Sequence, residues 1–187
     1  MSLEIKMDSQ ISDGYIILRK YNKEDLLNRY SAIKDNLQEI SKWLSFCRPD
    51  YTETQNLLWY VAYNKNWDNK IEFPFAIIEK ESGSYIGECV LNHINHLHKL
   101  ANVTYWIKKE FTGKGTTTRA VKLAAKFGFE KLELRRIEIF MEPENIASIK
   151  VAEKAGAVKE GILRNRIFSN EISKDALMYS LIPGDLK

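Results

Sequence analysis

The sequence predicts an α+β fold, a single domain with one mixed, mainly antiparallel sheet of seven strands flanked by helices. Three observations support this class. Segments in which apolar and polar residues alternate, as in half-buried strands, are interspersed with segments of helical spacing. Most strand segments follow one another through short turns, which favours antiparallel pairing. The 187 residues, 44% of them hydrophobic, can bury one substantial core, so we expect a single domain over 1–187.

The first third of the chain predicts one strand and two or three helices. Tyr15–Arg19 is the expected first strand. Asn22 suits the N-cap of a helix whose apolar residues recur at helical spacing. A second short helix should end near Ser41–Phe46, because Pro49 prevents its continuation. Thr52–Gln55 has capping-box form and should start a third helix.

The next segment predicts a hairpin with one carboxylate inside it. Phe73–Glu79 and Tyr85–Leu91 are the two strands, joined by a turn at Glu81–Ser84. Glu88 lies within the second strand. Its side chain either points to solvent or reaches into a cleft as a general base, and strand alternation does not decide between the two.

The chain has three histidines, all within six residues, which raises the question of a metal site. Their spacing fits neither one face of a helix nor one face of a strand. We therefore expect a connecting turn and no metal site here; the residues are His93, His96 and His98.

The stretch Asn102–Glu130 predicts a strand, a glycine-bearing turn and a helix. Residues alternate up to Lys108, Gly113 and Gly115 interrupt the pattern, and helical spacing begins at Thr117. The first turn of a helix has free backbone N–H groups and partial positive charge. Glycines before it let a ligand approach, so an anion, most naturally a phosphate, is the expected ligand. An ordinary strand-to-helix turn is the alternative that the local pattern leaves open.

Two phosphate-binding motifs do not fit this turn. The P-loop of nucleotide hydrolases requires glycine where Lys108 stands, and serine or threonine where Gly115 stands. A dinucleotide fingerprint requires a third glycine at Thr118. The strands before the turn are also joined by short turns rather than by crossover helices.

The last third predicts a strand, a helix and two closing strands. Arg135–Met141 is a strand that ends at Pro143. Asn145 suits the N-cap of a helix over Ile146–Ala155, which Gly156 ends. The closing antiparallel strands are Val158–Phe168 and Ser173–Leu181, around Ser169–Asn170.

Several segments, in this order and spacing, carry a family resemblance: IILRKYNKEDL, SKWL, YWIKKEFTGKG followed by TTT, FEKLELRRIEI, PENIASIKVAEKAGA, EGILR and a final YSL. Together they resemble the ribosomal-protein (RimJ/RimL-like) branch of the GNAT acetyltransferase superfamily over nearly the whole chain. The resemblance implies an N-acetyltransferase that moves the acetyl group of its co-substrate, acetyl-CoA, to a primary amine by direct attack in a ternary complex. It also implies a sheet that splays between the strands Asn102–Lys108 and Arg135–Met141.

The resemblance further implies which residues form the site. The acetyl-CoA pyrophosphate would lie on the TGKGTTT loop, and the Ile107 N–H would bind the thioester oxygen. Ser148 would donate a hydrogen bond to the departing thiolate, although taken locally Asn145 is a plain helix cap and Ser148 a solvent-facing hydroxyl. The expected catalytic residues are Ser148 and Glu88. The expected cofactor-binding residues are Ile107, Gly113, Lys114, Gly115, Thr116, Thr117, Thr118, Asn145 and Ser148.

The chain departs from the family pattern near this site. Thr112 replaces Gln or Arg, and Thr117 replaces Gly or Ala. Asn102 stands where this branch usually has Glu, and Thr104 where it usually has Gly. The helix Ile146–Ala155 contains no tyrosine, so the tyrosine acid of other branches is absent. A second class therefore stays open: a catalytically degenerate acetyl-CoA-binding sensor or partner module.

The expected partners are acetyl-CoA and an amine acceptor, either a protein N-terminus or a small molecule. A net charge of +3 with scattered lysines argues against direct nucleic-acid binding. The absence of a long apolar run or a signal peptide in MSLEIKMDSQ argues against a membrane. Cys47 and Cys89 suit a reducing cytoplasm, and a homodimer is left open. The aromatic residues that either line the acceptor pocket or pack in the core are Trp43, Trp59, Tyr60 and Tyr63.

Overall fold

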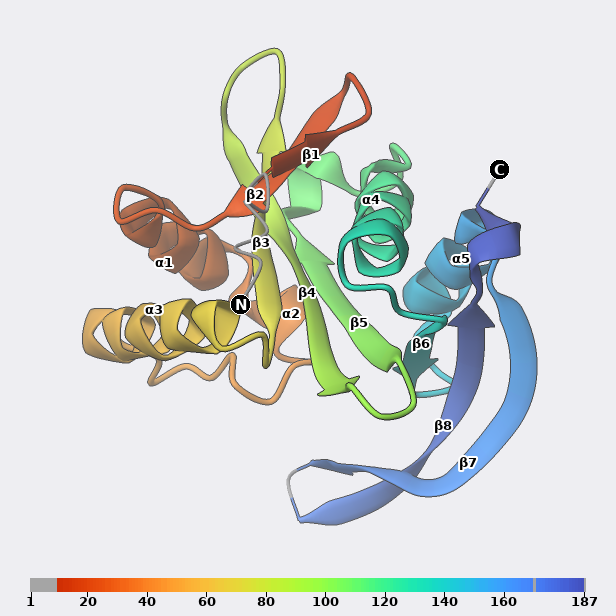
Figure 1. The fold of residues 1–187 in the computed structure, drawn as a ribbon. Helices are drawn as coiled ribbons and strands as arrows, with labels where there is room; N and C mark the ends of the chain where they lie inside the picture. Colours follow the sequence, from red (N-terminus) through yellow and green to blue (C-terminus); the bar gives the residue numbers. More distant parts are fainter. Residues whose placement is uncertain (1–9, 170, 187) are drawn as a thin grey trace.

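The structure is a computed structural model that describes residues 10–169 and 171–186. One sheet, with helices on both faces, runs through the molecule (Figure 1). Its strands are β1 (Gln10–Ser12), β2 (Ile16–Lys20), β3 (Phe73–Glu79), β4 (Tyr85–Asn95), β5 (Leu100–Ile107), β6 (Arg136–Met141), β7 (Val158–Ser169) and β8 (Ile172–Leu181). The helices are α1 (Asp25–Asp35), α2 (Leu37–Ile40), α3 (Glu53–Asp68), α4 (Thr116–Lys131) and α5 (Ile146–Ala155), with short 3-10 turns at Lys109–Phe111 and Pro183–Asp185.

The sheet has eight strands in the order β1-β2-β3-β4-β5-β6-β8-β7, one more than predicted. The additional strand is β1, which pairs antiparallel with β2. Its three residues are too few for an alternation signal. The other seven strands match the predicted order, so the α+β class is confirmed.

The sheet opens between β5 and β6, its one parallel pair. Their registered pairing runs from Leu100↔Arg136 to Asn102↔Glu138 and ends there, five residues before β5 ends at Ile107. Every other neighbouring pair is antiparallel. The divergence that the resemblance implies is therefore present, and it starts at Asn102.

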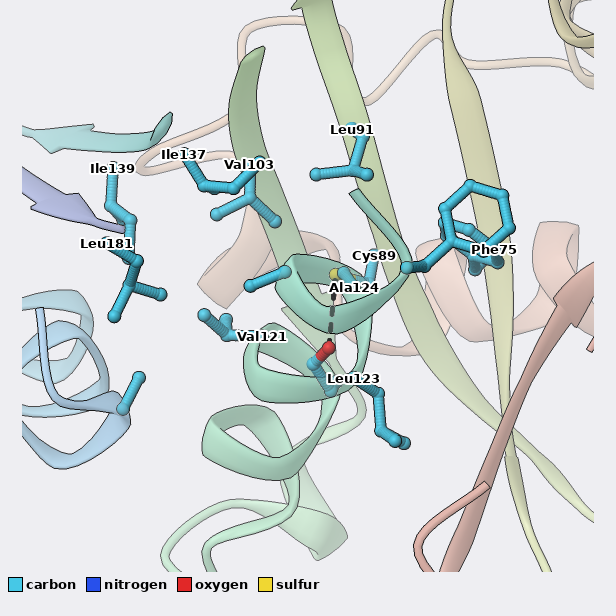
Figure 2. Close-up of a cluster of buried hydrophobic side chains, with 14 of the residues drawn as sticks. Phe75, Cys89, Leu91, Val103, Val121, Leu123, Ala124, Ile137, Ile139 and Leu181 are labelled. Atoms are coloured by element: carbon cyan, nitrogen blue, oxygen red, sulfur yellow. Dashed lines mark hydrogen bonds between the residues drawn. The ribbon is translucent and has the colours of Figure 1, made fainter. Parts of the chain in front are cut away.

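Two apolar cores lie on the two faces of the sheet. One packs the strands against α4 and α5, and the other packs them against α1 and α2. Figure 2 shows Val121 and Ala124 of α4 directed toward Leu91 and Val103 in the first of these cores. This is the helix face that the sequence spacing predicts, and it packs α4 against β4 and β5.

The helix ends largely follow the sequence signals. Thr52 and Gln55 form the expected capping box, and Asn145 accepts the N–H of Ser148 at 3.1 Å. The helix α1 begins at Asp25 with Glu24 at the cap position, so its N-cap lies two residues after the predicted Asn22. Asn22 still makes the cap-like bond, accepting the N–H of Asp25 at 3.2 Å.

Two other predicted boundaries are wrong. The helix α2 is a single turn that ends at Ile40, so Pro49 is not what stops it. The strand β4 extends to Asn95, which places His93 within a strand rather than in a connecting turn. The turn residue Asn170 and the start of the chain, in which no signal peptide is predicted, lie outside the described residues. No helix in the part that the structure describes is long and apolar enough to cross a membrane.

Candidate active site

The loop before α4 contains two glycines whose backbone is in the left-handed region. Gly113 and Gly115 have φ of +75° and +78°, a region that residues with a Cβ rarely adopt. Gly115 is the N-cap of α4 and provides no side-chain cap, so the first backbone N–H groups of the helix are available to a ligand. A Cβ at either glycine would meet no atom within 4 Å. The loop is therefore open, as an anion site at a helix N-terminus must be.

The two basic side chains near this loop differ in availability. Arg119 is bound to Asp13 at 2.8 Å and stacks on Tyr15 at 4.0 Å from the ring centre. Lys114 lies on the exposed loop with its ammonium group 5.3 Å from the ring centre of Phe111. Lys114 is thus the freer of the two cations for a phosphate.

The backbone at the end of β5 presents an N–H group to the opening in the sheet. Lys108 donates its N–H to Ile86 of β4 at 2.9 Å. Successive N–H groups along a strand point to opposite edges. The N–H of Ile107 therefore points away from β4, toward the side on which β5 no longer pairs with β6. This is the position that an oxyanion-binding donor requires.

Ser148 lies at the other wall of the opening, in the first turn of α5, and it is not simply solvent-facing. Its Oγ is 2.7 Å from the Oη of Tyr105, a β5 residue located beyond the point where β5 and β6 separate. Burial raises the pKa of the Tyr105 phenol, so the hydroxyl stays protonated at neutral pH. Sequence reasoning missed Tyr105, because alternation shows which face it occupies but not which helix it contacts.

Glu88 is buried on the opposite face of the sheet, 4% exposed, which excludes the solvent-facing alternative. Its carboxylate accepts hydrogen bonds from Arg29 Nε at 2.9 Å, from Tyr21 at 2.9 Å and from Trp106 at 3.4 Å. The contacts of Glu88 are thus those of a buried ion pair with Arg29. The role of Glu88 as a proton acceptor remains a prediction.

Arg29, in α1, is fully buried and forms the centre of this polar cluster. Its Nη1 donates to Tyr51 at 2.8 Å and to Asn56 at 2.6 Å, and its guanidinium stacks 3.5 Å from the ring centre of Trp59. Nothing in the sequence pointed to Arg29, whose ion-pair partner is 59 residues away.

A second cluster of hydrogen-bonded polar side chains lies at Asn102, where the pairing of β5 with β6 ends. Asn102 donates to Asn92 at 2.8 Å and to Thr104 at 3.1 Å. Its Oδ1 is buried and has no hydrogen-bond partner among residues 10–169 and 171–186. The two departures from the family pattern at positions 102 and 104 are therefore bonded to each other.

The aromatic side chains of α3 mostly pack rather than line a pocket. Trp59 contacts the rings of Tyr21 and Tyr63 at centroid distances of 4.9 and 4.7 Å. The cavity beside Trp59, Tyr60 and Tyr63 measures about 10 Å³, too small for an amine substrate. Trp43 is 40% exposed and remains available to a ligand.

The histidine segment gives no metal cluster. His96 lies 3.1 Å from the carbonyl oxygen of Lys70. Within the described part of the chain, no group of three potential metal-binding side chains is assembled.

The open loop at a helix N-terminus, the N–H of Ile107 and the Ser148 hydroxyl lie around the opening between β5 and β6, an arrangement suited to a phosphate-bearing acyl donor. Comparison with known proteins gives the family. Residues 16–158 match the acetyltransferase (GNAT) domain. The chain belongs to the GNAT acetyltransferase family, and it is an acetyl-CoA-dependent N-acetyltransferase.

Two of the relatives are named for different acceptors. The spermidine N(1)-acetyltransferase of Escherichia coli K12 is 31% identical over 86% of this chain and 82% of its own length. The ribosomal-protein-serine acetyltransferase of the same strain is 26% identical over 78% and 79%. Among solved structures, RimL in complex with coenzyme A superimposes with a TM-score of 0.86 at 18% identity, covering 95% of this chain and 99% of RimL. That structure supports the fold.

Proposed function

We propose that this chain transfers the acetyl group of acetyl-CoA to a primary amine by direct attack within a ternary complex. The observation that carries the proposal is the N–H of Ile107, which points into the opening between β5 and β6. A thioester carbonyl placed there would have a fixed donor for the charge that develops on its oxygen. The open glycine loop lies at the end of the same strand.

The remaining residues have complementary roles in this mechanism. The pyrophosphate rests on the backbone N–H groups from Gly113 to Thr118, and Lys114 adds positive charge. Asn145 caps α5 and so holds Ser148 beside the sulfur. The amine must be neutral to attack, so Glu88 or a water takes its proton. Holding both substrates in one cleft supplies much of the rate without a covalent enzyme intermediate.

The acceptor is either the N-terminal amine of a protein or a small polyamine-like molecule. The Escherichia coli relatives named for spermidine and for a ribosomal protein support the two possibilities about equally, since their identities to this chain are similar. A panel that contains both N-terminal peptides and polyamines separates them by kcat/KM.

The activity is tested by titrating the protein with acetyl-CoA and CoA in a calorimeter, and then by measuring thiol release against the amine panel. Tight binding with amine-dependent thiol release is expected. Binding without release on any amine of the panel would contradict the proposed transfer. No binding at all would overturn the proposal.

The loop is tested separately by Gly115→Asp, which places a negative charge and a Cβ beside the pyrophosphate. We expect acetyl-CoA affinity to fall at least about a hundredfold, since a repulsive charge replaces a close backbone contact. Gly83→Asp is the matched control. Gly83 also has a positive φ, +68°, and open space at its Cβ, but it lies in the β3–β4 hairpin. Unchanged affinity in folded Gly115→Asp would contradict the placement of the pyrophosphate.

A further inference from the structure

We infer that Tyr105 is a positioning residue for the leaving group: its phenol donates to Ser148 Oγ and thereby directs the Ser148 hydroxyl hydrogen to the sulfur of CoA. The inference rests on the proposed function and deepens it. The helix α5 contains no tyrosine. The inference therefore gives a role to a tyrosine that lies on a strand instead.

The contact connects the two walls of the opening. Tyr105 projects from β5 three residues beyond Asn102, the last β5 residue that pairs with β6. Ser148 belongs to the first turn of α5. Their hydroxyl oxygens are 2.7 Å apart, an ordinary distance for an O–H···O hydrogen bond. Both side chains are partly buried and keep some exposed surface.

The proposed role requires Tyr105 to be the donor of this bond, because the distance alone lets either oxygen donate. The backbone carbonyl of Ser148, 3.4 Å from the phenol, is a second and longer acceptor for the same hydrogen. A serine hydroxyl has one hydrogen to donate, while its oxygen can accept two bonds. If Ser148 donated to Tyr105, no hydrogen would remain for the sulfur. If Tyr105 donates, the Ser148 hydrogen is free. The phenol stays protonated because burial raises its pKa, so this donor persists when the thiolate forms.

Asn145 fixes the other side of the serine. Its Oδ1 accepts the N–H of Ser148 at 3.1 Å, so the backbone of Ser148 is held while Tyr105 orients the hydroxyl. Tyr105 itself packs against the large core beneath α4. The serine is therefore held at two points, and a departing thiolate meets an oriented hydrogen without reorganisation.

The reaction balances without any further reagent. The amine nitrogen forms a bond to the carbonyl carbon, the C–S bond breaks, and the electron pair leaves on sulfur. The proton lost by the attacking nitrogen equals the proton gained by the thiolate, so the products are the amide and the neutral thiol. Tyr105 ends the cycle as it began, with its phenol protonated.

The test is a double-mutant cycle with Tyr105→Phe, Ser148→Ala and both together, measured as kcat and KM on an amine that the wild type acetylates. Phenylalanine keeps the packed ring and removes only the hydroxyl. We expect Tyr105→Phe to lower kcat about tenfold with KM for acetyl-CoA unchanged, and Ser148→Ala to lower it at least as much. In the Ser148→Ala background, Tyr105→Phe should have no further effect, because its partner is already gone.

Tyr179→Phe is the matched control. It removes a phenol that also bonds to α5, to Glu153 at 3.4 Å, but from β8, which β6 separates from β5. Its kcat should stay within about twofold of wild type. Thermal unfolding of each variant verifies the fold.

Two results would overturn the inference. One is an unchanged kcat in folded Tyr105→Phe. The other is an equal loss of kcat from Tyr105→Phe with and without Ser148, which would mean that Tyr105 does not act through Ser148. A wild-type protein that binds acetyl-CoA but releases no thiol would instead overturn the proposed function, and the inference with it.

Discussion

Arg29 and Glu88 are the two residues of opposite charge that the fold buries against each other. Their side chains are 0% and 5% exposed, with Nε and Oε2 2.9 Å apart. Placing two charges in the interior has a large desolvation cost, which good geometry and further hydrogen bonds offset. Tyr51, Asn56 and Tyr21 supply those bonds. Removal of one partner alone is therefore the damaging change.

We expect Glu88→Gln and Arg29→Met each to lower the free energy of unfolding by roughly 3 kcal/mol or more, because each leaves the other charge unpaired. The double variant Arg29→Met/Glu88→Leu should lose less than the sum of the two. Urea unfolding measures all three. Lys42→Ala is the control: its partner Glu39 is half-exposed, and we expect a change below about 1 kcal/mol. An additive double variant would show that the pair is not coupled.

The same Glu88→Gln protein tests the catalytic role assigned to Glu88. If the carboxylate takes the proton of the amine, kcat per folded molecule falls roughly a hundredfold or more, with KM for acetyl-CoA unchanged. A change within about threefold would leave Glu88 with its ion-pair role alone.

Among the structural elements, β7 is held to β6 across β8 by a charge cluster. Arg136 of β6 binds Glu160 of β7 through two hydrogen bonds, and Ser180 of β8 donates to the same carboxylate at 2.7 Å. The hydrogen bonds from Arg136, and then from Ser180, lower the pKa of Glu160 from an ordinary 4.5 to about 2. The ionised form of Glu160 is thus favoured in the folded protein.

This shift predicts a stability change in acid. Because the folded pKa of Glu160 is depressed, its contribution is fully present above the unfolded value of 4.5 and disappears as the pH falls toward about 2. The difference in unfolding free energy between wild type and Glu160→Gln should therefore shrink over that interval. Urea titrations at several pH values measure it, and a difference that stays constant from pH 5 to pH 2 would contradict the assignment.

The sequence predicts those elements whose signals are local. The strand β3 and the helix α5 have the predicted bounds, because a turn or a cap marks each end within a few residues. The glycine loop was located for the same reason. In contrast, β1 is too short to show a pattern, and β4 runs past its apolar stretch into the histidine segment.

Contacts between distant segments could not be predicted in this way. Tyr105 and Ser148 are 43 residues apart, and Arg29 and Glu88 are 59 apart. Alternation and helical spacing show only which face a residue occupies. The partner across the sheet or on another helix depends on the tertiary arrangement, which is why Ser148 and Glu88 were predicted as site residues but Tyr105 and Arg29 were not.

At the scale of the whole molecule, the cofactor should act as a structural ligand. A molecule that bridges the α4 loop and the opening binds the folded chain and not the unfolded one. Acetyl-CoA at a hundred times its Kd should then add about 2.7 kcal/mol, equivalent to a rise in Tm of roughly 5–10 °C for a chain of this length. Differential scanning calorimetry measures the shift, and Gly115→Asp should not show it. An equal shift in that variant would place the ligand elsewhere.

The early end of β5–β6 pairing also bears on how the protein avoids self-association. A strand with free backbone groups at the rim of a sheet is a template for pairing with another chain. Here the stretch of β5 beyond Asn102 lies in the middle of the sheet, with β4 on one side and the β6-β8-β7 group on the other. Main-chain donors in this position can face a small ligand, whereas they do not form an outer edge of the sheet that a second polypeptide could extend.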